Sequence, residues 1–253
     1  MDGTLLNSQN EINPEFYPTF EKLKEKNILF AIASGRQYFN LLERFDALKN
    51  DIIFMAENGS FVLHKNKQIL LSSLERETAM KLLDVSRTLK HAYRIVCGAK
   101  FAYIEQREPE FIEQVEKYYK RYKIVDDLKQ IDDDILKITI CDLTGTKDNN
   151  ANAFAEFENN LLIAISGKIW LDISTKIANK GYAVQKTQEI FNISPEETMV
   201  FGDYLNDLQL MNSAFYSFAM ENAHPEIKKT ARFRAKSNDE NGVVESIKKF
   251  VLN

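Results

Sequence analysis

The stretch ILFAIASGR, residues 28–36, joins an unbroken apolar run to a polar Ser-Gly-Arg end. Such a run is typical of a strand that is buried on both faces, as in a parallel sheet. The stretches IIFMAENG (52–59) and TMVFGDYLND (198–207) repeat this order. Helical patterns separate the strands, and Asn13 and Pro14 mark the start of one helix. The two ends of the chain therefore predict a doubly wound α/β domain.

The middle of the chain follows a different pattern. Residues 75–89 and 109–122 have the spacing of amphipathic helices, and the strands around them are richer in polar residues. A sheet with one exposed face gives strands of this kind. We therefore expect an α+β insertion at about 75–176 in an α/β domain formed by residues 1–74 and 177–253.

Composition argues against several classes of protein. The 253 residues are 44% hydrophobic and 28% charged, with a formal net charge of −4, which is ordinary for a globular protein. No apolar run approaches the roughly 18 residues of a membrane helix, and the first residues do not form a secretory signal. The acidic balance argues against a broad nucleic-acid surface. Cys97 and Cys141 lie far apart in apolar surroundings, which predicts buried thiols. We expect a cytoplasmic protein without nucleic-acid or membrane partners.

Each predicted strand ends in residues that suit a phosphate site. Ligands of open α/β sheets bind at the carboxyl ends of the strands. The residues at these ends, and at the start of one helix, are Ser34-Gly35-Arg36, Glu57-Asn58-Gly59, Lys180-Gly181, Gly202-Asp203 and Asn206-Asp207. Each group alone has a simpler interpretation, because Asp203 with its neighbours can cap a helix and Lys180 can be a solvated lysine. Their position on one rim, in this order, favours a phosphate site.

The combination resembles the haloacid dehalogenase superfamily and, within it, the Cof-type phosphatases, over nearly the whole chain. DGTLL at residues 2–6 is similar to the second half of the first motif, Asp-x-Asp-Gly-Thr-Leu-Leu. Ser34-Gly35-Arg36 matches the second motif, Lys180-Gly181 the third, and GDYLND at 202–207 the fourth. The resemblance implies an enzyme, a phosphatase, with a Rossmann-like doubly wound core and the α+β insertion as its cap domain.

The resemblance also implies a mechanism and a metal. An aspartate attacks phosphorus and forms an aspartyl-phosphate, which water then hydrolyses. The carboxylate two residues later, Asp2, is the implied general acid and base. Mg²⁺ is implied as the cofactor, held by the nucleophile, the backbone carbonyl of Asp2 and the carboxylate of Asp203.

The remaining motif residues are implied to hold the phosphate group. Ser34 and the backbone amide of Gly35 bind phosphate oxygens, and Lys180 and Asn206 complete the phosphate site. Lys180 also counts among the catalytic residues, because it neutralises charge on the phosphate. Asp207 is implied to orient Lys180.

The first motif is incomplete in this chain. Its nucleophilic aspartate would stand immediately before Met1, on a central strand that would also precede Met1. About five buried apolar side chains on such a strand are worth roughly 10 kcal/mol, which rivals the net stability of a whole domain. We therefore expect an N-terminally incomplete chain that is inactive as it stands.

The predicted function is Mg²⁺-dependent hydrolysis of small phosphate monoesters, such as sugar phosphates or phosphorylated cofactors, by a monomer or weak homodimer. Two alternatives stay open: a catalytically dead homologue that binds phosphoesters or regulates another protein, and a phosphotransferase or phosphomutase on the same scaffold. Specificity is expected in the cap, because the core residues contact only phosphate and metal. Candidate contacts in the cap are Tyr93, Arg94, Tyr103 and Glu105.

Overall fold

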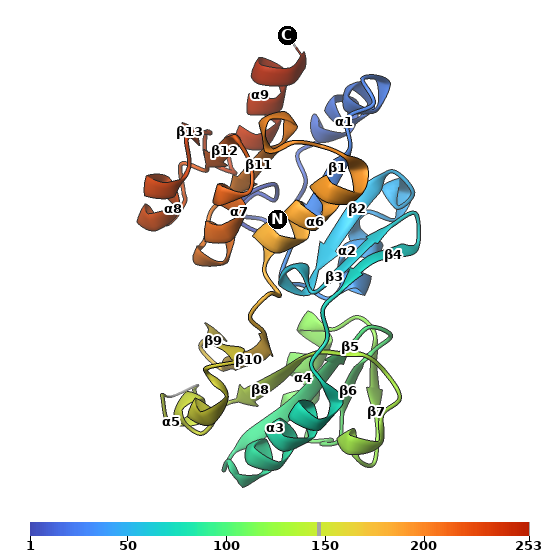
Figure 1. The fold of residues 1–253 in the computed structure, drawn as a ribbon, viewed down its shortest axis with the longest axis vertical. Helices are drawn as coiled ribbons and strands as arrows, with labels where there is room; N and C mark the ends of the chain where they lie inside the picture. The colour runs from blue at the N-terminus through green and yellow to red at the C-terminus, as the bar shows by residue number, and fades with distance from the viewer. Residues whose placement is uncertain (146–147, 253) are drawn as a thin grey trace. The chain divides into compact units, whose positions relative to one another are not determined.

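The computed structural model describes residues 1–145 and 148–252, and the chain forms two compact units (Figure 1). Unit 1 contains residues 1–35, 45–70 and 179–253, and unit 2 contains residues 36–44 and 71–178. The sequence did not lead us to expect residues 36–44 in unit 2. The assignment of one unit as core and the other as cap stays a prediction.

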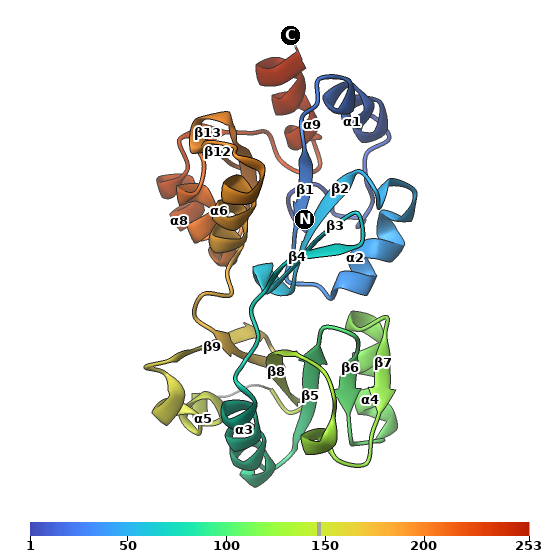
Figure 2. The same ribbon diagram turned by 45° about the vertical axis from the view of Figure 1, so that its right-hand side comes forward.

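Unit 1 holds two sheets. The first has the order β1-β2-β3-β4, and β1 pairs with β2 in parallel while β3 is antiparallel to β2. The second has the order β11-β12-β13, and all three strands are parallel. The strands are β1 (Phe30–Ala33), β2 (Ile52–Ala56), β3 (Phe61–His64), β4 (Lys67–Leu71), β11 (Met199–Gly202), β12 (Tyr216–Ala219) and β13 (Phe233–Arg234). Helices alternate with strands along the chain (Figures 1 and 2), and the predicted α/β fold class is confirmed.

The helices of unit 1 follow from local sequence signals. On α1, the side chains of Phe16, Phe20 and Leu23 are buried at the i, i+4 and i+7 spacing of one helix face. This helix begins two residues after Pro14, close to its predicted start. The helices are α1 (Phe16–Glu25), α6 (Lys180–Phe191), α7 (Leu208–Asn212), α8 (Pro225–Thr230) and α9 (Gly242–Ile247), with short turns η1 (Asp46–Leu48), η2 (Glu57–Gly59), η5 (Pro195–Glu197), η6 (Leu205–Asp207) and η7 (Lys248–Leu252).

Unit 2 is built on one six-stranded sheet with the order β7-β6-β5-β8-β10-β9. The strands are β5 (Ala92–Gly98), β6 (Ala102–Ile104), β7 (Tyr122–Ile124), β8 (Ile135–Asp142), β9 (Leu161–Gly167) and β10 (Trp170–Thr175). The other elements are α2 (Tyr38–Arg44), α3 (Arg76–Thr88), α4 (Pro109–Tyr118), α5 (Asp148–Asn152), η3 (Leu128–Gln130) and η4 (Ala155–Phe157).

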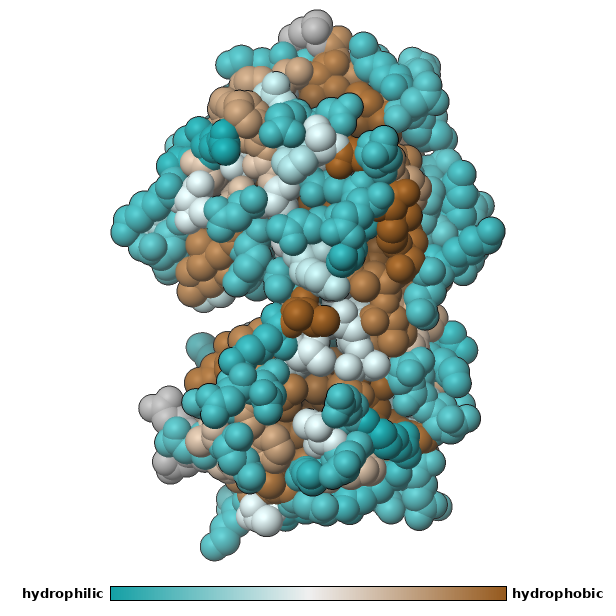
Figure 3. Space-filling view, viewed as in Figure 1, coloured by the Kyte–Doolittle hydropathy of each residue, from teal (hydrophilic) through white to brown (hydrophobic). Residues whose placement is uncertain are grey.

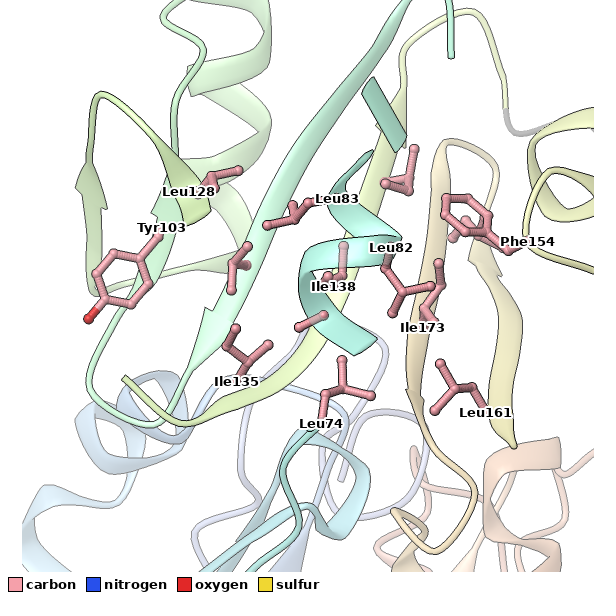
Figure 4. Close-up of a cluster of buried hydrophobic side chains, with 14 of the residues drawn as sticks. Leu74, Leu82, Leu83, Tyr103, Leu128, Ile135, Ile138, Phe154, Leu161 and Ile173 are labelled. Atoms are coloured by element: carbon pink, nitrogen blue, oxygen red, sulfur yellow. The ribbon is translucent and has the colours of Figure 1, made fainter. Parts of the chain in front are cut away.

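Two helices cover different faces of this sheet. Leu82 and Leu83 of α3 pack with Ile138 and Ile173 on one face (Figure 4). On the opposite face, Phe111 of α4 belongs to a second buried cluster, formed with side chains of β5 and β6. Alternate apolar side chains of β8 and β10 therefore lie on the face of the sheet that α3 covers.

Helix α2 belongs to unit 2 because two amide side chains bind it to the segment before β7. Gln37 donates through Nε2 to the carbonyl oxygen of Arg121 (2.9 Å) and accepts through Oε1 from the Arg121 N–H (3.1 Å). Asn40 forms the same kind of pair with the carbonyl of Tyr118 (3.0 Å) and the N–H of Lys120 (3.1 Å). Both amides are buried, so each hydrogen bond also satisfies a group that would be costly to leave unpaired.

Polar residues cover most of the face seen in Figure 3 and interrupt its apolar patches. Cys97 and Cys141 are buried thiols in unit 2, and burial raises the pKa of Cys141 to about 12. Within residues 1–145 and 148–252, every helix is too short or too polar to span a membrane.

Candidate active site

The residues that follow β1, β2 and β11 lie together at one edge of unit 1. The side chain of Asn206 donates to Asn58 Oδ1 at 3.0 Å, which joins the ends of β2 and β11. A Cβ atom at Gly35 would lie 3.0 Å from the same Asn58 oxygen, which brings the end of β1 to this point as well. The common rim that the sequence predicted is therefore present for these three strands.

The first residues of the chain lie on the same rim. Thr4 Oγ1 donates to Asp203 Oδ1 at 2.5 Å. Gly3 has a φ of +66°, and a Cβ atom there would lie 2.4 Å from Asp203 Oδ2. Only glycine fits such an approach. The structure thus brings the DGT segment of the first motif against the aspartate of the fourth motif.

Lys180 and Asp207 form a buried ion pair beside this contact. The side chain of Asn179 accepts from the Tyr182 N–H at 2.9 Å and caps α6, so Lys180 is the first residue of the helix. Lys180 Nζ lies 2.6 Å from Asp207 Oδ1, and the two side chains are 5% and 4% exposed. The second oxygen of Asp207 accepts from the Asp203 N–H at 3.0 Å. Asp207 therefore links the third motif to the fourth.

The charges explain how these groups titrate. Burial alone would raise the pKa of the Asp207 carboxyl, but the charges of Lys180 and of the chain's amino terminus outweigh it and hold the pKa below its usual range. At Asp203 burial dominates and raises the pKa of the carboxyl, although the Thr4 hydroxyl opposes the shift. Burial also lowers the pKa of the Met1 amino group, and Lys180 adds to this effect. The rim therefore holds the positive charge of Lys180 and the carboxyl groups of Asp203 and Asp207 close together, where burial affects their titration.

Ser34 and Asp2 differ in their surroundings. Ser34 is buried, its N–H donates to Met55 O at 3.0 Å, and its carbonyl accepts from the Asn58 N–H at 2.9 Å. These bonds continue the β1–β2 ladder past the end of β1 and fix the Ser34 backbone. Asp2 is exposed, and its neighbour Met1 accepts from the N–H of Leu5 at 2.9 Å in a tight turn.

Sequence reasoning gave no role to two residues that hold the DGT segment in place. The first is Thr4, through its contact with Asp203. The second is Asn222, whose Nδ2 donates to the carbonyl oxygen of Gly3 at 2.7 Å. The side chain of Asn238 adds a hydrogen bond to Leu6 O at 2.8 Å. The only signal for Thr4 was its place in the motif, because a partner 199 residues away leaves no local pattern.

The buried pair gives the first testable prediction. Asp207→Asn is expected to lower the free energy of unfolding by roughly 3–5 kcal/mol, because Lys180 is left with an uncompensated buried charge. Urea denaturation measures this change. Glu189→Gln is the matched control, since it removes an ion pair of the same length, Lys186–Glu189 (2.6 Å), from an exposed part of the same helix. Equal effects of the two substitutions would contradict the prediction.

Comparison with known proteins decides the family. The family model of haloacid dehalogenase-like hydrolases matches residues 1–247. The chain belongs to this family. The 5-amino-6-(5-phospho-D-ribitylamino)uracil phosphatase YbjI of Escherichia coli is 30% identical over 252 residues, which cover 98% of this chain and 93% of the relative. The putative phosphatase YkrA of Bacillus subtilis is 27% identical and covers 100% of this chain and 96% of the relative.

Two solved structures share the fold of nearly the whole chain. SMU.1108c from Streptococcus mutans has a TM-score of 0.86 at 27% identity, with 100% of this chain and 97% of that chain covered. TM0651 from Thermotoga maritima has a TM-score of 0.89 at 25% identity, with 100% and 96% covered. The predicted superfamily and the predicted enzyme class, a phosphatase, are confirmed. The predicted inactivity of the 253-residue chain stays a prediction.

Proposed function

We propose that this haloacid dehalogenase-like hydrolase removes phosphate from small phosphate monoesters, with Mg²⁺ and through an aspartyl-phosphate. The observation that carries the proposal is the contact of the first, third and fourth motifs at one rim, where the buried Lys180–Asp207 pair lies beside Asp203, Thr4 and Gly3. In this proposal unit 1 is the core and unit 2 is the cap, and the reaction takes place in the cytoplasm.

Each residue has a role in the proposed reaction. The carboxylate of an aspartate directly before Met1 attacks phosphorus, the bond from phosphorus to the leaving oxygen breaks, and Asp2 gives that oxygen its proton. Asp2 then takes a proton from water as the water oxygen attacks phosphorus. The bond from phosphorus to the aspartate breaks, and inorganic phosphate leaves. Ser34, Gly35, Lys180 and Asn206 hold the phosphate oxygens throughout.

The oxygen donors of the rim fit Mg²⁺. No group of three or more His, Cys, Asp or Glu residues in the described part of the chain is arranged to hold a metal. Mg²⁺ keeps several waters, however, and needs only one or two carboxylates. The Asp203 carboxylate and the Asp2 backbone carbonyl supply hard oxygen donors beside Gly3, where a side chain would fill the space that the Asp203 carboxylate occupies. When bound, Mg²⁺ neutralises charge on the phosphoryl oxygens.

An extended chain tests this function. We define it as the present chain preceded by about five apolar β-branched residues and an aspartate directly before Met1. It is expected to release phosphate from an aryl phosphate, to lose activity in a chelator and to regain it when Mg²⁺ is restored, as a colorimetric phosphate assay would show. Saturable binding of inorganic phosphate without turnover by a folded extended chain would contradict the proposal and favour the phosphoester-binding alternative.

Substrate specificity is proposed to reside in unit 2, on other residues than those first named. Arg94 is buried and donates to the Ser86 carbonyl at 2.9 Å, and Glu105 pairs with Arg87 at 2.8 Å. Tyr93 stacks on Phe111, 4.5 Å between ring centroids. Tyr103 Oη donates to Asp133 at 3.0 Å. These four side chains are therefore engaged in the packing and ion pairs of unit 2 itself.

The sheet face opposite α3 carries a further cluster of polar side chains. Thr139 and Asp172 are cross-strand neighbours on β8 and β10, and Thr139 Oγ1 donates to Asp172 Oδ1 at 2.6 Å. Lys137 Nζ lies 3.4 Å from Asp172 Oδ2, with only 9% and 16% of the two side chains exposed. Thr139 and Lys137 are as buried as Arg94, and both donate to Asp172. The two donors and one acceptor of this cluster match the hydroxyl groups of a polyol or sugar that exchanges hydrogen bonds with them. We propose that they contact the leaving group.

Asp172→Asn in the extended chain tests this assignment. It is expected to lower kcat/KM by about 10-fold or more for hydroxyl-rich esters, such as sugar phosphates and a phosphorylated ribitylamino-uracil. The kcat/KM for an aryl phosphate is expected to change far less. Glu105→Gln is the control, because it removes a paired carboxylate elsewhere in the same unit. A uniform loss over all esters in the panel would contradict the assignment.

A further inference from the structure

The six-stranded sheet of unit 2 ends in two unlike edge strands. Within residues 1–145 and 148–252, β7 and β9 are the outermost strands of this sheet (Figures 1 and 2). β7 is the short segment Tyr122–Ile124, and its middle residue is the exposed Lys123. β9 has seven residues, LLIAISG, with no charge and no proline. Short length and charged residues protect an edge from pairing with another chain, so β7 is protected and β9 is not.

β9 exposes apolar side chains on both faces of the sheet. Its register with β10 sets Ile165 opposite Leu171 and Leu162 opposite Ser174. Leu171 belongs to the buried cluster on the face that α3 covers, so Ile165 shares that face and Leu162 lies on the other one. The side chains of Ile165 and Leu162 are 52% and 42% exposed. Such side chains beside an open backbone edge fit an occupant that is itself an apolar β-strand.

A second copy of β9 is an occupant of this kind. Two identical antiparallel strands are related by a two-fold axis, so that residues at equal distances on either side of the axis face each other. An axis through Ile163 places Leu161 opposite the partner's Ile165, and Leu162 opposite the partner's Ala164. Every facing pair in this stretch is then apolar, and cross-strand pairs of this kind stabilise a sheet.

The charges at the two ends of β9 favour the same register. Glu158 precedes β9, Lys168 follows it, and both side chains are exposed. The two residues lie at equal distances in sequence from Ile163. An axis through Ile163 therefore brings Glu158 of each copy to the partner's Lys168, and the two-fold symmetry forms this pair of opposite charges twice.

The neighbouring register matches the sequence less well. An axis through Ala164 pairs a longer stretch of β9, but it places Leu162 opposite Ser166. It also brings Lys168 to Asn160, which carries no charge. An axis nearer the start of β9 shortens the paired stretch. The apolar pairs and the charges thus agree only on the axis through Ile163.

We propose that two copies of this chain associate through β9, antiparallel about an axis at Ile163, and join their unit 2 sheets into one continuous sheet. Backbone hydrogen bonds between the two β9 strands supply the affinity, and the Glu158–Lys168 pairs fix the register. The interface consists of one strand edge from each copy, which places it below the roughly 1,200 Å² of stable complexes. The dimer is therefore weak and forms reversibly.

Sedimentation velocity on the 253-residue chain tests the association. We expect the mean mass to rise from that of a monomer toward that of a dimer between about 1 µM and about 1 mM, the Kd range of weak complexes. Leu162→Lys places a charge on the exposed edge and is expected to weaken association at least 10-fold. Ile190→Lys is the control, because Ile190 is 55% exposed on α6 of unit 1.

Three results of this experiment would overturn the proposal. The first is a chain that stays monomeric over the whole range, and the second is equal association of Leu162→Lys and Ile190→Lys. The third is protection of the β9 amides from hydrogen exchange in a monomeric chain, because a segment of the same chain then covers the edge. Phosphate release is not measured, so none of these results bears on the proposed enzyme.

Exchange of the two charges tests the register. Lys168→Glu and Glu158→Lys each bring like charges together and are each expected to weaken association by about 5-fold or more. Both residues are exposed, so each variant is expected to keep the Tm of the unaltered chain. A mixture of the two variants is expected to associate again, because each copy then meets the opposite charge at both ends. A mixture that associates no better than the separate variants would show that the axis does not pass through Ile163.

Discussion

Asparagine in place of the aspartate before Met1 is expected to reduce phosphate release by the extended chain by about 10⁴-fold or more. The reaction requires a carboxylate oxygen that attacks phosphorus and forms a covalent intermediate, and an amide oxygen is a far weaker nucleophile. Asparagine has nearly the same size and shape as aspartate. The loss is therefore expected in kcat, while the Tm of the two extended chains stays within a few degrees.

The position directly before Met1 suits a nucleophile for reasons of charge. Burial lowers the pKa of the Met1 amino group, Lys180 lowers it further, and Asp207 and Asp203 act in the opposite direction. A carboxylate attached at this point lies among the groups proposed to hold phosphate and metal. Acid-quenched protein incubated with a ³²P-labelled ester provides a second measurement, because the aspartate chain is expected to retain label and the asparagine chain is not. Equal turnover by the two chains would show that another residue attacks phosphorus.

The sequence predicted those features that depend on neighbouring residues. The apolar runs at 28–33 and 52–56 contain β1 and β2. β2 is buried along its whole length, as predicted for a strand buried on both faces. The same prediction was wrong for β1, in which Ala31 is exposed and only Ile32 is fully buried. The polar residues after β1 and β2 meet because these parallel strands end on the same edge of one sheet. β11 belongs to the second sheet, and its end is joined to this edge by the Asn206–Asn58 hydrogen bond. The start of α6 at Lys180 follows from the capping side chain of Asn179, which is a local signal.

Features that depend on distant partners were not predicted. No local pattern indicates that Gln37 and Asn40 pair with backbone groups some 80 residues later, in unit 2. The specificity candidates were chosen for polarity alone, which cannot separate Arg94, buried against Ser86, from Lys137 and Asp172 on the other face of the sheet. Residues that are far apart in the sequence leave no local pattern when they pair. The strand pairing and the burial of side chains in the structure are needed to identify them.

Asp203→Ala in the extended chain is expected to lower kcat by about 10³-fold or more and to leave the fold intact. Asp203 is the carboxylate proposed to hold Mg²⁺, and loss of a directly bound metal removes several kcal/mol of charge stabilisation in the transition state. The backbone of Asp203 is fixed by bonds that the substitution leaves in place. Its N–H donates to Asp207 Oδ2 at 3.0 Å, and its carbonyl accepts from the His224 N–H at 2.8 Å.

The Asp203 prediction separates a metal ligand from a residue that only supports the rim. If Asp203 binds Mg²⁺, the apparent affinity for Mg²⁺, measured by titration of the variant with MgCl₂, falls along with kcat, and Tm changes little. Thr4→Val is the informative companion, because it removes the hydroxyl that donates to Asp203 Oδ1 but keeps the carboxylate. It is expected to lose far less activity than Asp203→Ala. A near-normal rate of Asp203→Ala at low Mg²⁺ would show that Asp203 does not hold the metal. The roles proposed for Lys180 and Asn206 would then be wrong as well.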